Sequence, residues 1–131
     1  MKHNLALVTL VLPLFASGCV LAAGVGVGYI VSQQVLPNNV HVTQVSLDVD
    51  HVWPSVKETM AIYQEPGSQI AVQDSPRTIH ATVDGAKVLV EVEAIDLDRT
   101  TIRVSAERYL TKDDATAAQV ESGIIAHLDK N

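Results

Sequence analysis

The sequence predicts an α+β domain of the order β-α-β-β-β-α, with an antiparallel four-stranded sheet and two helices packed on one face. Three observations support this class. Four segments after residue 40 carry apolar residues at every second position, two carry them at helical spacing, and turn residues separate neighbouring segments. Because the predicted strands are apolar on one side only, both helices are expected on that side.

The first strand and the first helix are predicted between residues 40 and 64. Val45, Leu47 and Val49 alternate with polar residues, which is typical of a half-buried strand. Asp50 is the expected helix N-cap, and Pro54 would then lie in the first turn, where its missing N–H is not needed. The apolar stripe of this helix is expected to consist of Val52, Val56, Met60 and Tyr63, and the helix to end before Pro66-Gly67.

Three further strands are predicted between residues 79 and 107. Their inward residues are Ile79, Ala81, Val83, Val88, Val90, Val92, Ile102, Val104 and Ala106. Asp84-Gly85 favours the positive φ values of a tight hairpin turn. A second turn is expected around Asp98-Arg99, after a bulge or strand end near Ala94 where the alternation breaks.

The last helix is predicted from a start signal and an apolar stripe. Thr111 with Asp114 three residues later resembles a capping box. The buried face of the helix is expected to consist of Ala117, Val120, Ile124 and Leu128.

Residues 1–18 are predicted to be a lipoprotein signal peptide. A short positive start is followed by an apolar run of about 11 residues and then by small residues. Ala16-Ser17-Gly18-Cys19 resembles the bacterial lipobox, Leu-(Ala/Ser)-(Gly/Ala)-Cys, with Ala16 in the usual leucine position. By this resemblance Cys19, the single cysteine, is the lipidation site and the mature N-terminus, and its acyl chains anchor the protein to a membrane.

An uncleaved transmembrane helix is the alternative for this region, and it would make the protein a single-pass membrane-anchored domain. Leu5 to Val31 is 27 residues long without a charged residue, and about 20 apolar residues span a bilayer. Pro13 and several glycines make a poor helix, however, and the cysteine lies where a lipobox needs it. The favoured organisation is a signal peptide over 1–18, a lipidated Gly/Ala/Val-rich tether over 19–39, and the α+β domain over 40–131.

Several short motifs carry a family resemblance. They are the Gly/Ala/Val-rich stretch after Cys19, Asp48-Val49-Asp50-His51-Val52-Trp53, Arg99-Thr100-Thr101-Ile102-Arg103-Val104, and Ile124-Ile125 in the last helix. The chain thereby resembles the small bacterial lipoproteins of unknown function grouped as the DUF3568 domain. The resemblance implies an envelope lipoprotein with this fold, and it implies no activity.

Composition and motif spacing argue against several function classes. A net charge of −6 repels phosphate backbones, so no nucleic-acid partner is expected. The histidines are scattered without metal-ligand spacing, and the acidic residues around the second turn match no calcium loop. No Gly-x-Ser-x-Gly motif is present. We therefore expect no enzyme activity, no cofactor and no metal. The residues weighed as metal ligands are His41, His51, His80, His127, Glu91, Glu93, Asp96 and Asp98.

The outward side of the three hairpin strands is the candidate binding surface. Its polar residues are His80, Thr82, Glu91, Glu93, Arg103, Ser105 and Glu107. Glu93 is expected almost opposite Arg103, as a cross-strand ion pair. The leading hypothesis is a non-catalytic envelope lipoprotein whose domain binds a protein or an envelope polymer. Val20 stands where an aspartate is associated with inner-membrane retention in enteric bacteria, which favours the outer membrane, facing the periplasm.

A carrier of a small apolar ligand is the alternative function. Helices held slightly off the sheet would enclose a pocket lined by Val90, Val104, Met60 and Ile124. The same residues fit ordinary core packing, so a filled core would argue against a carrier.

Overall fold

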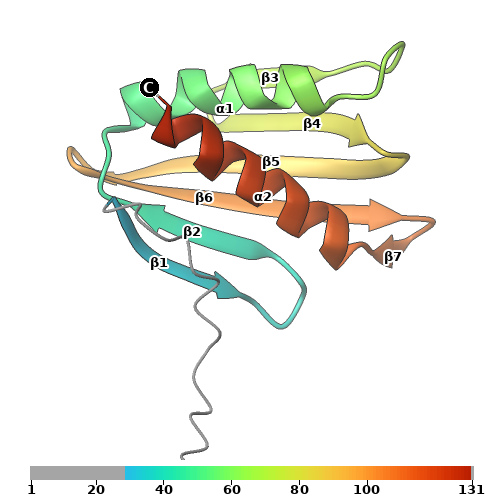
Figure 1. The fold of residues 1–131 in the computed structure, drawn as a ribbon, viewed down its shortest axis with the longest axis horizontal. Coiled ribbons are helices and arrows are strands. Elements are labelled where there is room, and N and C mark those ends of the chain that lie inside the picture. Colours follow the sequence, from blue (N-terminus) through green and yellow to red (C-terminus); the bar gives the residue numbers. More distant parts are fainter. Residues whose placement is uncertain (1–28, 131) are drawn as a thin grey trace, which may run out of the picture.

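An antiparallel sheet carries two helices on one of its faces in the computed structural model, which describes residues 29–130 (Figure 1). The elements in chain order are β1 (Ile30–Val35), β2 (His41–Val45), α1 (Val49–Tyr63), β3 (Ala71–Asp74), β4 (Arg77–Val83), β5 (Ala86–Asp96), β6 (Arg99–Arg108), β7 (Thr111–Lys112) and α2 (Asp114–Asp129). The strand order is β1-β2-β6-β5-β4-β3, and β7 pairs with the end of β6. Helix α1 packs over β4 and β5, and α2 packs over β6 and β2.

The α+β class and the placement of both helices on one face are confirmed, but the predicted number of four strands is wrong. The sheet also contains β1, β3 and the two-residue β7. All four residues of β3 are exposed, so no apolar alternation marks it in the sequence. β1 lies within the segment expected to be the end of the tether, over residues 19–39. The folded part therefore begins before residue 40.

The first predicted strand ends earlier than its alternation indicates. β2 stops at Val45, and Val49 is already the first residue of α1. Asp48, not Asp50, is the N-cap, because its carboxylate accepts a hydrogen bond of 2.7 Å from the Asp50 N–H. With this start Pro54 lies inside the helix rather than in its first turn. The helical stripe is correct: Val52, Val56 and Met60 are fully buried.

The three hairpin strands follow the prediction closely. All nine predicted inward residues of these strands are buried. Asp84 and Gly85 have φ values of 49° and 78°, as a tight turn between twisted strands requires. The register of β5 against β6 shifts between Ala94 and Asp96, so the expected bulge is present.

Helix α2 has a different N-cap from the predicted one. Asp113 caps it by accepting hydrogen bonds from the backbone N–H and the hydroxyl of Thr116, at 3.1 and 2.8 Å. These bonds, helped by Arg108, lower the pKa of the Asp113 carboxyl. Thr111, the expected cap, belongs to β7 instead. The stripe of Ala117, Val120, Ile124 and Leu128 is buried as predicted.

The core lies between the helices and the sheet. Val90, Val104, Met60 and Ile124, the residues proposed to line a ligand pocket, are fully buried within one apolar cluster. Trp53 is also buried, and its indole N–H donates to Asp74 at 2.7 Å. The packing of these residues is that of a filled core, which argues against the apolar-ligand carrier.

The two helices approach each other closely at one glycine. A Cβ built on Gly123 would lie 2.4 to 2.6 Å from atoms of the Tyr63 ring. Because glycine has no Cβ, the Tyr63 ring of α1 can lie against the backbone of α2 at Gly123. Glu58 of α1 and His127 of α2 add a contact of 2.7 Å between carboxylate and imidazole.

Candidate functional site

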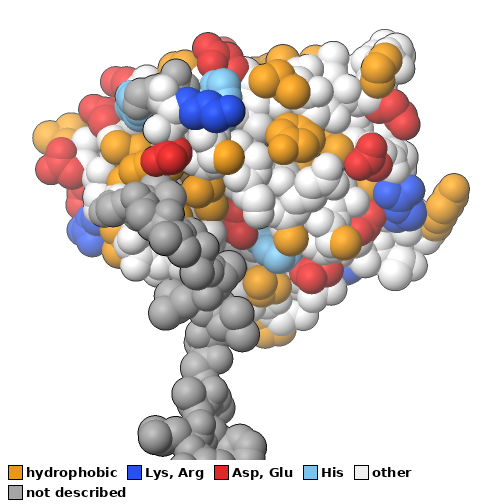
Figure 2. Space-filling view, in the orientation of Figure 1, with side chains coloured by type: hydrophobic (Ala, Val, Ile, Leu, Met, Phe, Trp, Pro, Cys, Tyr) orange, Lys and Arg blue, Asp and Glu red, His pale blue; other side chains and the backbone are white. Residues whose placement is uncertain are grey.

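The seven residues predicted as a binding surface all lie on the side of the sheet that carries neither helix of residues 29–130, which we call the open face. They come from β4, β5 and β6, whose inward neighbours are buried under α1 and α2. Figure 2 shows the opposite, helix-bearing face, where apolar and charged side chains are interspersed. The alternation of each strand is what brings the seven residues to one side.

Strand register orders the open face into rows across the sheet. Directly paired residues form three rows: Thr82, Lys87, Glu107 and Lys112; Ala71, His80, Leu89 and Ser105; and Thr78, Glu91, Arg103 and Val42. Side chains within one row are immediate neighbours. The rows therefore alternate between charged and uncharged character.

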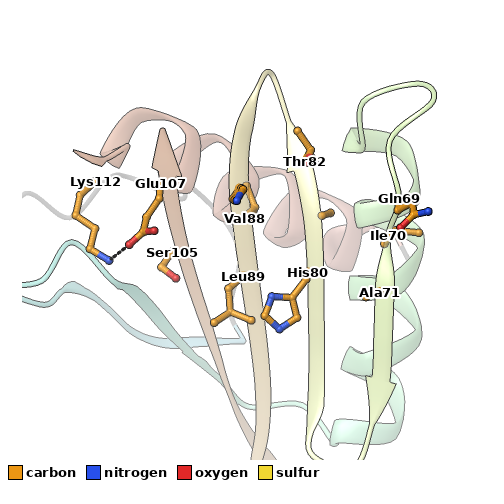
Figure 3. Close-up of a pocket in the computed structure, with 12 residues that line it drawn as sticks. Gln69, Ile70, Ala71, His80, Thr82, Val88, Leu89, Ser105, Glu107 and Lys112 are labelled. Carbon is orange, nitrogen blue, oxygen red and sulfur yellow. Dashed lines mark hydrogen bonds and ion pairs between the residues drawn. The ribbon is translucent and has the colours of Figure 1, made fainter. Parts of the chain in front are cut away.

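A first hollow of about 610 Å³ occupies one end of the open face (Figure 3). It is lined by four of the predicted residues, His80, Thr82, Ser105 and Glu107. The remaining lining residues are Gln69, Ile70, Ala71, Ala81, Lys87, Val88, Leu89 and Lys112. In the close-up, His80 and Leu89 lie side by side, and Lys112 reaches Glu107 from β7. Polar side chains thus surround a small apolar floor.

Two lysines set the electrostatics of the first hollow. The Lys112 ammonium donates to the Glu107 carboxylate at 2.8 Å. This hydrogen bond, and then the charges of Lys112 and Lys87, lower the pKa of Glu107. The carboxylate stays ionised at neutral pH, so the hollow combines one anion with two cations.

A second hollow of about 350 Å³ lies further along the same strands and includes the other three predicted residues. Arg103 donates to Glu93 at 3.0 Å, which confirms the expected ion pair. The residue directly opposite Arg103 is nevertheless Glu91, and Glu93 reaches it diagonally. Together with Arg77 these groups balance two cations against two carboxylates.

The open face keeps Ser105, a candidate nucleophile, away from His80, a candidate base. His80 and Ser105 lie in one row but are separated by Leu89 on the strand between them. Two strand spacings put them about 9–10 Å apart, beyond hydrogen-bond reach. What the face offers is hydrogen bonding and paired charge over a broad area.

The sequence reasoning missed a polar cluster on the helix-bearing side. His41 on β2 is buried, and its Nε2 lies 2.6 Å from an Asp114 carboxylate oxygen. Its Nδ1 lies 3.5 Å from Glu121, which also accepts from the Thr43 hydroxyl at 2.8 Å. The cluster joins β2 to α2, and only the pairing of distant segments reveals it. Within residues 29–130, no three His, Cys, Asp or Glu side chains are grouped to hold a metal ion.

The predicted lipidation site, Cys19, lies outside the described residues, as do the signal peptide and most of the tether. Over residues 29–130, no helix has the length and apolar character needed to cross a membrane. Ile30 and Val31, the last two residues of the segment weighed as a transmembrane helix, belong to β1.

No protein-family model matches the chain, and no curated protein has a similar sequence. The resemblance to the DUF3568 lipoproteins stays a prediction that depends on the short motifs quoted above.

Proposed function

We propose that this protein is a lipid-anchored envelope protein whose open face binds a polar partner, a protein segment or an envelope polymer, without transforming it. The proposal joins two inferences. The predicted signal peptide and Cys19 indicate the location in the cell envelope, and the open face supplies the binding surface. An outer-membrane anchor facing the periplasm is favoured by the residue after the cysteine.

One observation supports the binding role most directly. The seven predicted residues lie together on the open face, and all of them line its two hollows. A sheet covered by helices on one side needs only polarity on the other side to stay soluble. Two adjoining hollows give this face concave relief in addition, and ligands bind preferentially in concave sites.

The charge pattern of the open face indicates the chemistry of the partner. The second hollow has balanced charge, and the first has an excess of one cation from Lys87 and Lys112 over Glu107. Such a surface does not select a strongly charged ligand. Its hydroxyl groups and ion pairs fit a partner that is elongated, rich in hydrogen-bonding groups and weakly charged.

Site-specific photo-crosslinking in living cells tests the binding role. A benzoylphenylalanine at His80, which is exposed beside the first hollow, is expected to yield a defined adduct after irradiation. The matched control is the same amino acid at Ile62 on α1, which is 72% exposed on the helix-bearing face. No adduct at His80, or the same adduct from both positions, would contradict the proposal.

Measuring the masses of the intact protein and of its N-terminal peptide tests the lipid anchor separately. The wild-type chain expressed in bacteria is expected to begin at an acylated Cys19, and Cys19→Ala is expected to lose the modification. A chain that keeps Met1 and an unmodified thiol would instead support the single-pass anchor. Because this measurement does not involve the open face, the two parts of the proposal can fail independently.

A further inference from the structure

The two edges of the sheet differ in how they are protected from further strand pairing. β3 forms one edge, has only four residues and ends at Asp74, two residues before Pro76. Short length, charge and proline are common devices that prevent edge strands from pairing with other chains. This edge is therefore closed to further pairing.

β1 forms the other edge and has almost none of these devices. Its six residues, Ile30–Val35, include no charge and no proline, and a bulge affects only the first end, between Ile30 and Ser32. Val31 and Val35 are 50% and 55% exposed. In Figure 1, α2 crosses β5 and β6, and neither helix of residues 29–130 lies over β1. No strand among residues 29–130 pairs with the outer side of β1.

The charge distribution indicates what kind of strand fits this edge. Every Asp and Glu of the chain lies after residue 47, so the hairpin of β1 and β2 carries no formal charge on a protein of net charge −6. Two copies of the chain repel each other through their acidic parts. This repulsion is smallest when they approach along β1, and an uncharged edge offers nothing to select a charged partner.

We infer that β1 pairs with β1 of a second copy, antiparallel, and joins two sheets into one. Opposite residues in such a pair have side chains on the same face. The two-fold axis must therefore pass between a residue and its own copy, and not between two residues that are neighbours in the sequence. Centring it on Gln33 brings Gln33 opposite its own copy and Ser32 opposite Gln34. The same register brings the exposed Val31 opposite Val35. This register pairs five residues, 31–35. Centring on Ser32 would also pair five, but it would place the irregular end at Ile30 within the paired segment.

This pairing has a geometric consequence for the open face. Because the two-fold axis is perpendicular to the sheet, the helices of both copies lie on one side and both open faces lie on the other. The dimer therefore has one continuous open face of twice the width.

Disulfide crosslinking of the full chain in bacterial membranes tests the pairing. Gln33→Cys places two thiols directly opposite each other, at a Cα separation that a disulfide accepts. We expect an oxidation-dependent dimer well above that of the wild type, whose only thiol is Cys19. Gln73→Cys on β3 is the matched edge control, and it is expected to stay at the wild-type level.

A charge swap tests the register in the same membranes, read out with an amine-independent crosslinker or by native mass. Lysines at both Ser32 and Gln34 place like charges opposite each other and are expected to raise the Kd of the dimer about tenfold. Ser32→Lys with Gln34→Glu places opposite charges in the same positions and is expected to retain the dimer. Monomers throughout, equal dimer from Gln73→Cys, or the same loss in both double variants would overturn the inference. The Gln33→Cys result adds no charge, so it stands even if a lysine disturbs β1.

Discussion

Replacing Gly123 by alanine tests the helix contact that holds α1 against α2. The new Cβ would lie 2.4 Å from Cε2 and 2.5 Å from Oη of Tyr63, whereas carbon contacts normally lie at about 3.5–4.0 Å. The ring must therefore move by about 1 Å. Tyr63 is half-buried and packs against the core, so the movement is resisted from behind.

The size of the effect follows from two opposing terms. Overpacking of this kind costs about 1–3 kcal/mol. Alanine in place of glycine inside a helix contributes about 1 kcal/mol in the other direction. We expect Gly123→Ala to lower the free energy of unfolding by about 1 kcal/mol, which corresponds to roughly 4–8 °C in Tm for a domain of this size.

The same substitution in a Tyr63→Ala variant makes the prediction decisive. In a Tyr63→Ala chain the overpacking disappears, so the same glycine substitution is expected to stabilise by about 1 kcal/mol. The change of sign is measured by urea unfolding, followed by Trp53 fluorescence and by circular dichroism. Stabilisation by the same amount in both backgrounds would refute the proposed contact.

Three further perturbations test the local structure. His41→Ala is expected to cost about 2–3 kcal/mol in urea unfolding, because it leaves the partly buried Glu121 with one partner fewer; a change below about 0.5 kcal/mol would show that the cluster is not structural. Asp48→Ala removes the N-cap of α1 and should lower stability by about 1 kcal/mol, while Asp48→Asn, which still accepts the hydrogen bond, should lower it less. Asp113 has a lowered pKa in the folded state because Thr116 donates to it. Its contribution is therefore present above the unfolded pKa of an aspartate and is lost as the pH falls through the lower folded value. Asp113→Asn should flatten the acid limb of the stability profile, and an unchanged limb would contradict the assignment.

Local patterns predicted the parts of the fold that depend on local physics. The inward residues of β4, β5 and β6 follow from alternation, and the turn at Asp84-Gly85 follows from the φ values that only a few residue types adopt easily. Because alternation assigns each strand residue to a face, it also brought the candidate binding residues together before any strand pairing was known.

Three expectations failed, two at the start of α1 and one at β1. Alternation continues from Val45 through Val49, yet the Asp48 cap ends the extended segment. Pro54 was assigned to the first turn because the helix start was misplaced. β1 has no polar alternation and reads as a continuation of the uncharged leader, so only its pairing with β2 identifies it as a strand.

The sequence by itself determined the α+β class, the apolar faces of two helices and three strands, and the polar character of the open face, because each depends on residues a few positions apart. The sheet order, the edge position of β1, the hollows of the open face and the His41 cluster were decided only by the tertiary structure. These features join residues that lie tens of positions apart. Every strand offers the same backbone N–H and C=O groups, so backbone hydrogen bonding alone does not determine which strands are neighbours. Packing of the two helices over one continuous core makes that choice.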